Sequence, residues 1–185
     1  MRALLDRLYA AALWLSALCI LTIALLVGLQ VGARILDGLL KLVGVQRTGF
    51  VILSLSDFAG YLLAAASFLA LAATLKSGVH IRVTMLLGAL PEGLRRWFET
   101  GALALATLVA AFGTWHLGVL AYDSWRFGEL SSGLVPVPLV YPQAVMVLGA
   151  GLLVVALLDE LVITLRRGRP SFRATEDALT LGQEG

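Results

Sequence analysis

The sequence predicts an all-α integral membrane protein, a bundle of four transmembrane helices with an interfacial segment between the second and the third. The first supporting observation is composition, since 59% of the 185 residues are hydrophobic, 14% are charged and the mean hydropathy is +0.92. An ordinary soluble domain carries about 25% charged residues. So few polar residues cannot cover a water-soluble core, and the bilayer must be the solvent of this chain.

The second observation is the length of the apolar runs, because a helix that crosses the hydrocarbon needs about 20 mostly apolar residues. Four stretches meet this condition, at residues 8–31, 50–75, 97–122 and 141–165. Helix is the expected conformation, since a strand would leave its backbone unpaired in lipid and the runs lack barrel alternation. We expect a transmembrane domain over residues 1–169 and a polar cytoplasmic tail over residues 170–185.

The third observation is the distribution of basic residues outside the spans. Most of them fall in three segments that share one side of a four-span protein: Arg2, Arg7, Lys76, Arg82, Arg95, Arg96, Arg166, Arg167, Arg169 and Arg173. The other side has fewer, namely Arg34, Lys41, Arg47 and Arg126. The positive-inside rule therefore predicts that both termini lie in the cytoplasm.

The first run begins like a secretory signal, with Arg2 and Arg7 before an apolar stretch. An export signal has about 7–15 apolar residues, whereas this stretch continues over residues 8–33, so we expect a retained span. Small residues four apart, such as Gly28 and Gly32, permit close helix approach. Similar pairs recur in the second and third runs, although an alanine-rich chain also produces them by chance.

The second run carries Asp57 about two turns from its outer end, where an unpaired carboxylate is costly. A partner is implied, and Arg34 is a candidate because it leaves the first span on the same side. Three further acids, Glu99, Asp159 and Glu160, lie near the cytoplasmic ends of their spans. We expect these three to reach the lipid headgroups or to pair with nearby basic residues.

The connection after the second run reads LKSGVHIRVTML at residues 75–86. Its Lys76 and Arg82 would each cost about 2.5–3.5 kcal/mol at the centre of a membrane helix, so they act as an orientation signal. Val79, Ile81 and Val83 alternate with polar residues, which favours a segment lying along the membrane interface.

The third run is followed by a segment rich in glycine, serine and proline, at residues 122–143. Pro136, Pro138 and Pro142 fix φ and remove amide donors, so we expect an extended strap leading into the fourth helix. A rigid interhelical connector and a binding loop both remain open interpretations.

Catalytic and cofactor signatures do not emerge from the sequence. His80 and His116 are expected on opposite sides of the membrane, so one chain cannot clamp a haem between them. The single Cys19 allows neither an intrachain disulfide nor a cysteine metal cluster, and hydrolase and phosphate-loop motifs are missing. Basic residues form no long tract, which argues against nucleic-acid binding. We expect no enzyme activity, no metal and no cofactor.

Taken together, several segments resemble the small membrane subunit of tripartite ATP-independent periplasmic (TRAP) transporters, the DctQ-like family. The similarity covers residues 30–34, 57–61 and 64–74, then KSGVHIRV at 76–83 and WRFGELSSGLVPVPLVYPQ at 125–143. The order and spacing of these segments carry the resemblance. The chain departs from the family pattern in having Asp57 where glutamate is usual, Thr84 where aspartate is frequent, and a longer first connection containing LLKLVGVQRTGF.

The resemblance implies a multi-pass protein of a bacterial or archaeal inner membrane that pairs stably with a large TRAP membrane subunit. That subunit would carry the substrate and sodium sites, and a periplasmic substrate-binding protein would deliver an organic acid by transient contact. This chain would be a scaffold, with these partner-interface or structural candidates: Arg34, Asp57, Gly60, Lys76, Gly78, His80, Arg82, Trp125, Gly128, Ser132, Pro136 and Pro138. The alternative is a free-standing four-span accessory protein of another membrane complex.

Overall fold

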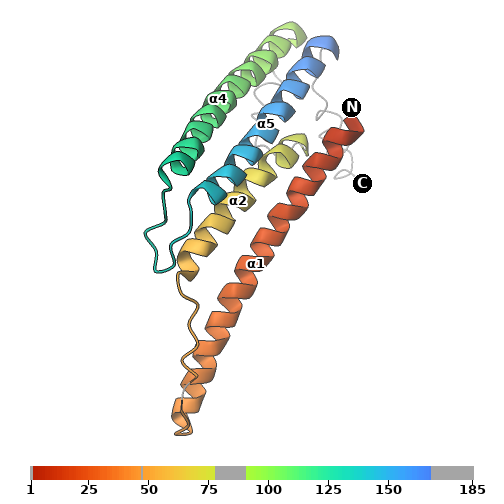
Figure 1. Cartoon of the computed structure of the whole chain (residues 1–185). Helices are drawn as coiled ribbons and strands as arrows, with labels where there is room; N and C mark the ends of the chain where they lie inside the picture. Colours follow the sequence, from red (N-terminus) through yellow and green to blue (C-terminus); the bar gives the residue numbers. More distant parts are fainter. Residues whose placement is uncertain (1, 47, 78–90, 168–185) are drawn as a thin grey trace, which may run out of the picture.

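The computed structural model describes residues 2–46, 48–77 and 91–167, and the described chain folds into four helices (Figure 1). These are α1 (Arg2–Leu42), α2 (Leu55–Lys76), α4 (Glu92–Phe127) and α5 (Val140–Arg167). Each is long and apolar enough to cross a membrane. The prediction of an all-α fold with four membrane-spanning helices is therefore confirmed.

The helices lie in a row, in the spatial order α1, α2, α5, α4 (Figure 1). Their order in the chain makes α2 and α5 parallel neighbours at the centre, while α1 and α4 are antiparallel to them on the two flanks. A row buries less of each helix than a closed ring would. Many large side chains on the flanking helices consequently remain exposed, including Trp14, Leu25, Leu108 and Trp115.

The central helices approach each other closely at Gly149 of α5. A Cβ at this position would lie 2.5 Å from the carbonyl carbon of Phe68, so only glycine fits against the backbone of α2. Farther along the same interface, Ala72 and Ala156 are fully buried. By contrast, Gly28 and Gly32 of α1 have open space beside them, so that small-residue pair contacts none of the other described helices.

Helix α1 is longer than the other three and extends beyond them at one end (Figure 1). Because Ser16 Oγ donates to Ala66 O at 2.8 Å, the start of α2 at Leu55 lies level with about residue 27 of α1. Residues 28–42 therefore project about 22 Å past the start of α2, at 1.5 Å per residue. The expected span of residues 8–31 is contained in this helix, which continues as one rod to Leu42.

The described residues that follow α1, 43–46 and 48–54, lead back from its tip, and Asp37 contacts this return segment. Its Oδ1 accepts hydrogen bonds from Thr48 N at 2.7 Å and Thr48 Oγ1 at 2.6 Å, and its Oδ2 accepts one from Gly49 N at 3.0 Å. Gly49 has φ near +65°, a conformation that glycine adopts without strain. We call residues 28–54 the arm.

The connection between α4 and α5 is a short hairpin, residues 128–139, and the extended strap expected from its prolines was wrong. Ser131 N donates to Val137 O at 2.9 Å and Leu139 N donates to Glu129 O at 3.0 Å, around a bridge between Leu130 and Pro138. Pro138 fits there because the residues beside it supply the donors. We call this the hairpin, and the end of the bundle that carries it the hairpin end.

Candidate functional site

Two polar sites occupy the two ends of the helix row. The first lies at the termini end, where α1 begins and α5 finishes. Lys76 Nζ of α2 is 2.8 Å from Asp159 Oδ2 of α5, with side chains 23% and 19% exposed. The same ammonium lies 5.4 Å from the ring centroid of Tyr9, a buried residue of α1. One lysine therefore connects three helices.

Further polar groups of α4 and α5 are buried at the termini end. Glu160 and Thr164 are completely buried, Thr164 Oγ1 donates to Glu160 O at 2.8 Å, and Glu99 of α4 is 8% exposed. Arg96 Nη2 donates to Leu165 O at 3.3 Å. Neighbouring helices of this chain therefore cover Glu99 and Glu160, which do not reach the headgroups, whereas Asp159 pairs with a basic residue, Lys76, as the expectation allowed.

The buried positions of α5 follow the helical period. Ala156, Glu160 and Thr164 are each four residues apart, so they form one stripe along α5, and all three are fully buried. The buried surface of α5 thus runs continuously from apolar to polar side chains. We call Tyr9, Lys76, Glu99, Asp159 and Glu160 the closed site.

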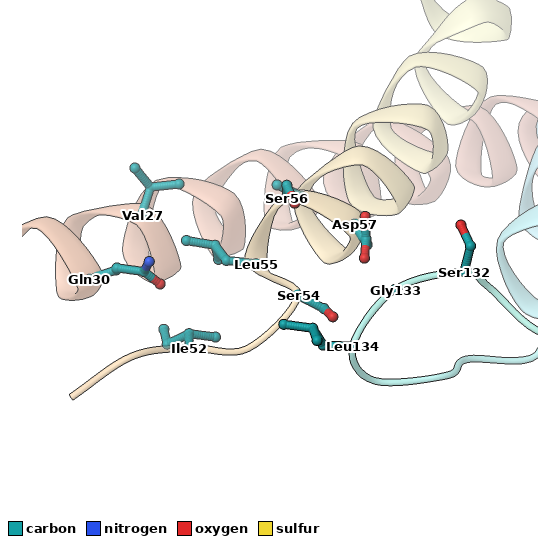
Figure 2. Close-up of a pocket in the computed structure, with 11 residues that line it drawn as sticks. Val27, Gln30, Ile52, Ser54, Leu55, Ser56, Asp57, Ser132, Gly133 and Leu134 are labelled. Atoms are coloured by element: carbon teal, nitrogen blue, oxygen red, sulfur yellow. The ribbon is translucent and has the colours of Figure 1, made fainter. Parts of the chain in front are cut away.

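The second polar site is a groove of about 680 Å³ at the hairpin end, between α1, the first turn of α2 and the hairpin (Figure 2). It is lined by Val27, Gln30, Ile52, Ser54, Leu55, Ser56, Asp57, Ala59, Ser132, Gly133 and Leu134. Its walls are mostly apolar, with hydroxyls, one amide and one carboxylate as the polar groups. We call this the open groove.

Ser54 joins the start of α2 to the hairpin. Its Oγ accepts a hydrogen bond from Val135 N at 3.0 Å, and its carbonyl accepts hydrogen bonds from Asp57 N at 3.0 Å and Phe58 N at 3.1 Å. Its φ of 55° lies in the left-handed region, which is uncommon for a residue with a side chain. The hairpin and α2 thus form one rigid wall of the groove.

Asp57 occupies the first turn of α2, where a carboxylate interacts favourably with the helix dipole. Gly133 of the hairpin lies directly against it, and a Cβ on Gly133 would overlap the carboxylate oxygen Oδ2. The sequence analysis did not single out Gly133. No local pattern identifies it, because the contact joins residues far apart in the chain.

The pairing of Asp57 with Arg34 that was considered from the sequence does not form within this chain. Both residues are described, and no ion pair joins them; the basic partner shown for a described carboxylate is Lys76, which pairs with Asp159. None of the described residues that line the open groove is basic. The carboxylate of Asp57 therefore faces a groove whose described lining contains no cation.

The remaining sequence-predicted residues are dispersed. Ser132 lines the open groove, Gly128 ends α4 with φ near +64°, and Pro138 lies in the hairpin bridge. The others fall into two groups. Gly60, Trp125 and Pro136 are exposed, whereas Gly78, His80 and Arg82 lie outside the described residues. Across the described ranges, no group of three or more potential metal ligands comes together.

Comparison with known protein families gives a match over residues 42–167 to the model described as "Tripartite ATP-independent periplasmic transporters, DctQ component". The matched range includes α2, α4, the hairpin and α5, and therefore the open groove apart from its two α1 residues. No curated protein and no solved structure matches the chain. The family is a transporter component that functions with a large membrane component and a substrate-binding protein. The chain belongs to this DctQ family and is a TRAP transporter small membrane subunit.

Proposed function

We propose that this subunit is the fixed scaffold of its transporter, supporting the large membrane subunit during sodium-coupled uptake of an organic acid from a periplasmic binding protein. The observation that carries the scaffold role is the placement of charge. Between the two ends, the four helices have no Asp, Glu, Lys or Arg: residues 8–33, 58–75, 100–122 and 140–158 lack all four. A transported ion would need polar groups along its path.

The packing supports the same role. The closed site joins α1, α2 and α5 through Lys76, and Gly149 locks α5 against the backbone of α2. Such contacts stabilise a single arrangement of the helices relative to alternative packings. The row also offers two broad apolar faces, and a scaffold needs an extended surface on which a larger membrane protein can rest.

We place the termini end in the cytoplasm and the hairpin end in the periplasm. The support is the excess of basic residues near the termini end, including Arg7, Lys76 and Arg166. With this orientation the arm projects into the periplasm. The proposed residence is a bacterial or archaeal inner membrane.

Affinity purification of the tagged chain in mild detergent from its native membrane tests the scaffold proposal. We expect a large multi-span protein to co-purify in a stoichiometric complex. Recovery of the chain alone, folded and monodisperse, would contradict the proposal and favour the free-standing accessory protein. Reconstituted complex, supplied with the binding protein and radiolabelled organic acids, should accumulate substrate only with an inward sodium gradient.

The sequence further predicts that Arg82→Glu weakens association with the large subunit more than it alters substrate selectivity. A change of selectivity in an intact complex would contradict a scaffold role.

A further inference from the structure

We propose that the open groove receives a basic side chain of the large membrane subunit, which forms an ion pair with Asp57. The inference rests on the proposed function, because it assigns a specific contact to the partner that the scaffold supports. Three observations support it: charge complementarity, the hydrogen-bond acceptors that line the groove, and the position of the groove along the axis of the helix row.

The polar atoms of the open groove are suited to a cationic donor. Asp57 supplies a carboxylate, and Gln30 supplies Oε1, which is buried and has no hydrogen-bond donor among the described residues. Figure 2 shows the two side chains on opposite sides of the groove, one from α1 and one from α2. A guanidinium presents five N–H donors in a planar fork, and an ammonium presents three, so either has donors enough for more than one acceptor.

The apolar walls strengthen the case for an ion pair. Val27, Ile52, Leu55 and Leu134 line the groove beside these acceptors. A carboxylate in such surroundings is stabilised by an opposite charge more than it would be in open water. The closed site offers a comparison within the same chain. There, at the opposite end of α2 and α5, the carboxylate of Asp159 forms an ion pair with Lys76.

The level of the groove favours a membrane partner over a soluble one. Asp57 lies level with about residue 25 of α1, whereas the arm extends well past that point. The hairpin lies on another side of the groove (Figure 2). A soluble protein approaching this end would meet the arm and the hairpin first. Lysine and arginine at the ends of membrane helices extend their charged groups to the membrane–water interface. Such a residue of a membrane partner would lie at the level of Asp57.

The first test measures binding of the large subunit to purified variants of this chain. Asp57→Asn keeps the shape of the side chain and removes its charge, so we expect at least about a tenfold loss of affinity, as for one partner of a desolvated charge pair. Asp57→Glu should retain most of the affinity. Asp6→Asn, the same chemical change at an exposed acid near the termini end, should have no effect.

A second test does not depend on altering Asp57. A photo-crosslinking amino acid at Ser56, an exposed residue that lines the groove, is introduced into the full transporter in native membranes. We expect a crosslink to the large subunit, with the attached peptide containing or adjoining a lysine or arginine. Crosslinks to the periplasmic binding protein, or to lipid alone, would overturn the proposal.

The outcomes separate the inference from the function on which it rests. If the wild-type chain recovers no large subunit, the scaffold proposal fails. If it does, but Asp57→Asn binds equally well and remains monodisperse, only the ion pair is refuted. Arg34→Gln provides a further control: if it reproduces the loss seen with Asp57→Asn, the cation comes from this chain and the proposal is also refuted.

Discussion

The closed site and the open groove place carboxylates at opposite ends of the same helix row, yet among the described residues only the closed site has a cation beside its carboxylate. At the closed site, Asp159 has Lys76 at 2.8 Å, and the neighbouring Glu160 is completely buried by other helices. At the open groove, Asp57 faces hydroxyls, an amide and apolar walls. The first arrangement serves the fold of the subunit, and the second leaves a charge for a partner to neutralise.

The two sites also differ in the contacts that maintain their geometry. The closed site is formed by helix faces that pack along their length, so its geometry follows from the bundle. The open groove depends on two connections, the arm and the hairpin, joined at Ser54 and Gly133. Its shape therefore depends on a few contacts between these connections rather than on helix packing.

The largest effect should come from Lys76→Leu. It leaves the Asp159 carboxylate without its cation. Removing one partner of a fully buried pair costs about 3–5 kcal/mol, and this pair is partly buried, so the loss should be about 2–3 kcal/mol. Stability can be measured by reversible SDS unfolding of the purified subunit. Lys41→Leu, in the last turn of α1, should change stability little.

The double variant with Asp159→Leu tests the origin of that loss. It should be more stable than Lys76→Leu alone, since it removes the unpaired charge. Asp57→Leu should destabilise the isolated subunit less than Lys76→Leu does. Equal losses from the two single variants would remove the distinction between the closed site and the open groove.

An intermediate effect is expected from Gly133→Ala, because the new methyl group would overlap the Asp57 carboxylate. The cost should be about 1 kcal/mol, the low end for overpacking, because both residues are only partly buried and the carboxylate can rotate away from the methyl group. Gly151→Ala, where a Cβ meets nothing within 4 Å, is the matched control in the same unfolding measurement.

Combining Gly133→Ala with Asp57→Ala should recover stability, because it removes the overlapping carboxylate. A double variant as unstable as Gly133→Ala alone would show that the strain lies elsewhere in the hairpin.

The smallest effect should follow Ser16→Ala, which removes the hydrogen bond to Ala66 O between the two sites. Hydrogen bonds between membrane helices contribute about 0.6 kcal/mol on average, so this variant sets the scale for an uncharged contact. Thr22→Ala is the control, since Thr22 Oγ1 bonds only within its own helix in the described contacts. A loss as large as that of Lys76→Leu would contradict the special role of charge at the closed site.

The sequence by itself determined that the chain lies in a bilayer, how many times it spans it, and which family it belongs to. Hydropathy over about 20 residues is a local property, so it places four helices without knowledge of their neighbours. The ordered segments around residues 57–83 and 125–143 predicted the DctQ family, which the family match over residues 42–167 confirmed. Asp57 was identified for the same reason, since one acid in a long apolar run is visible locally.

Only the tertiary structure decided which side chains meet. The row order, the pairing of Lys76 with Asp159, the burial of Glu160 and the contact of Gly133 with Asp57 all join distant parts of the chain. In a soluble protein, an apolar stripe would show which face of each helix turns inward. Lipid is as apolar as the interior of this bundle, so that signal is weak here, and close packing and a few polar contacts determine the faces instead.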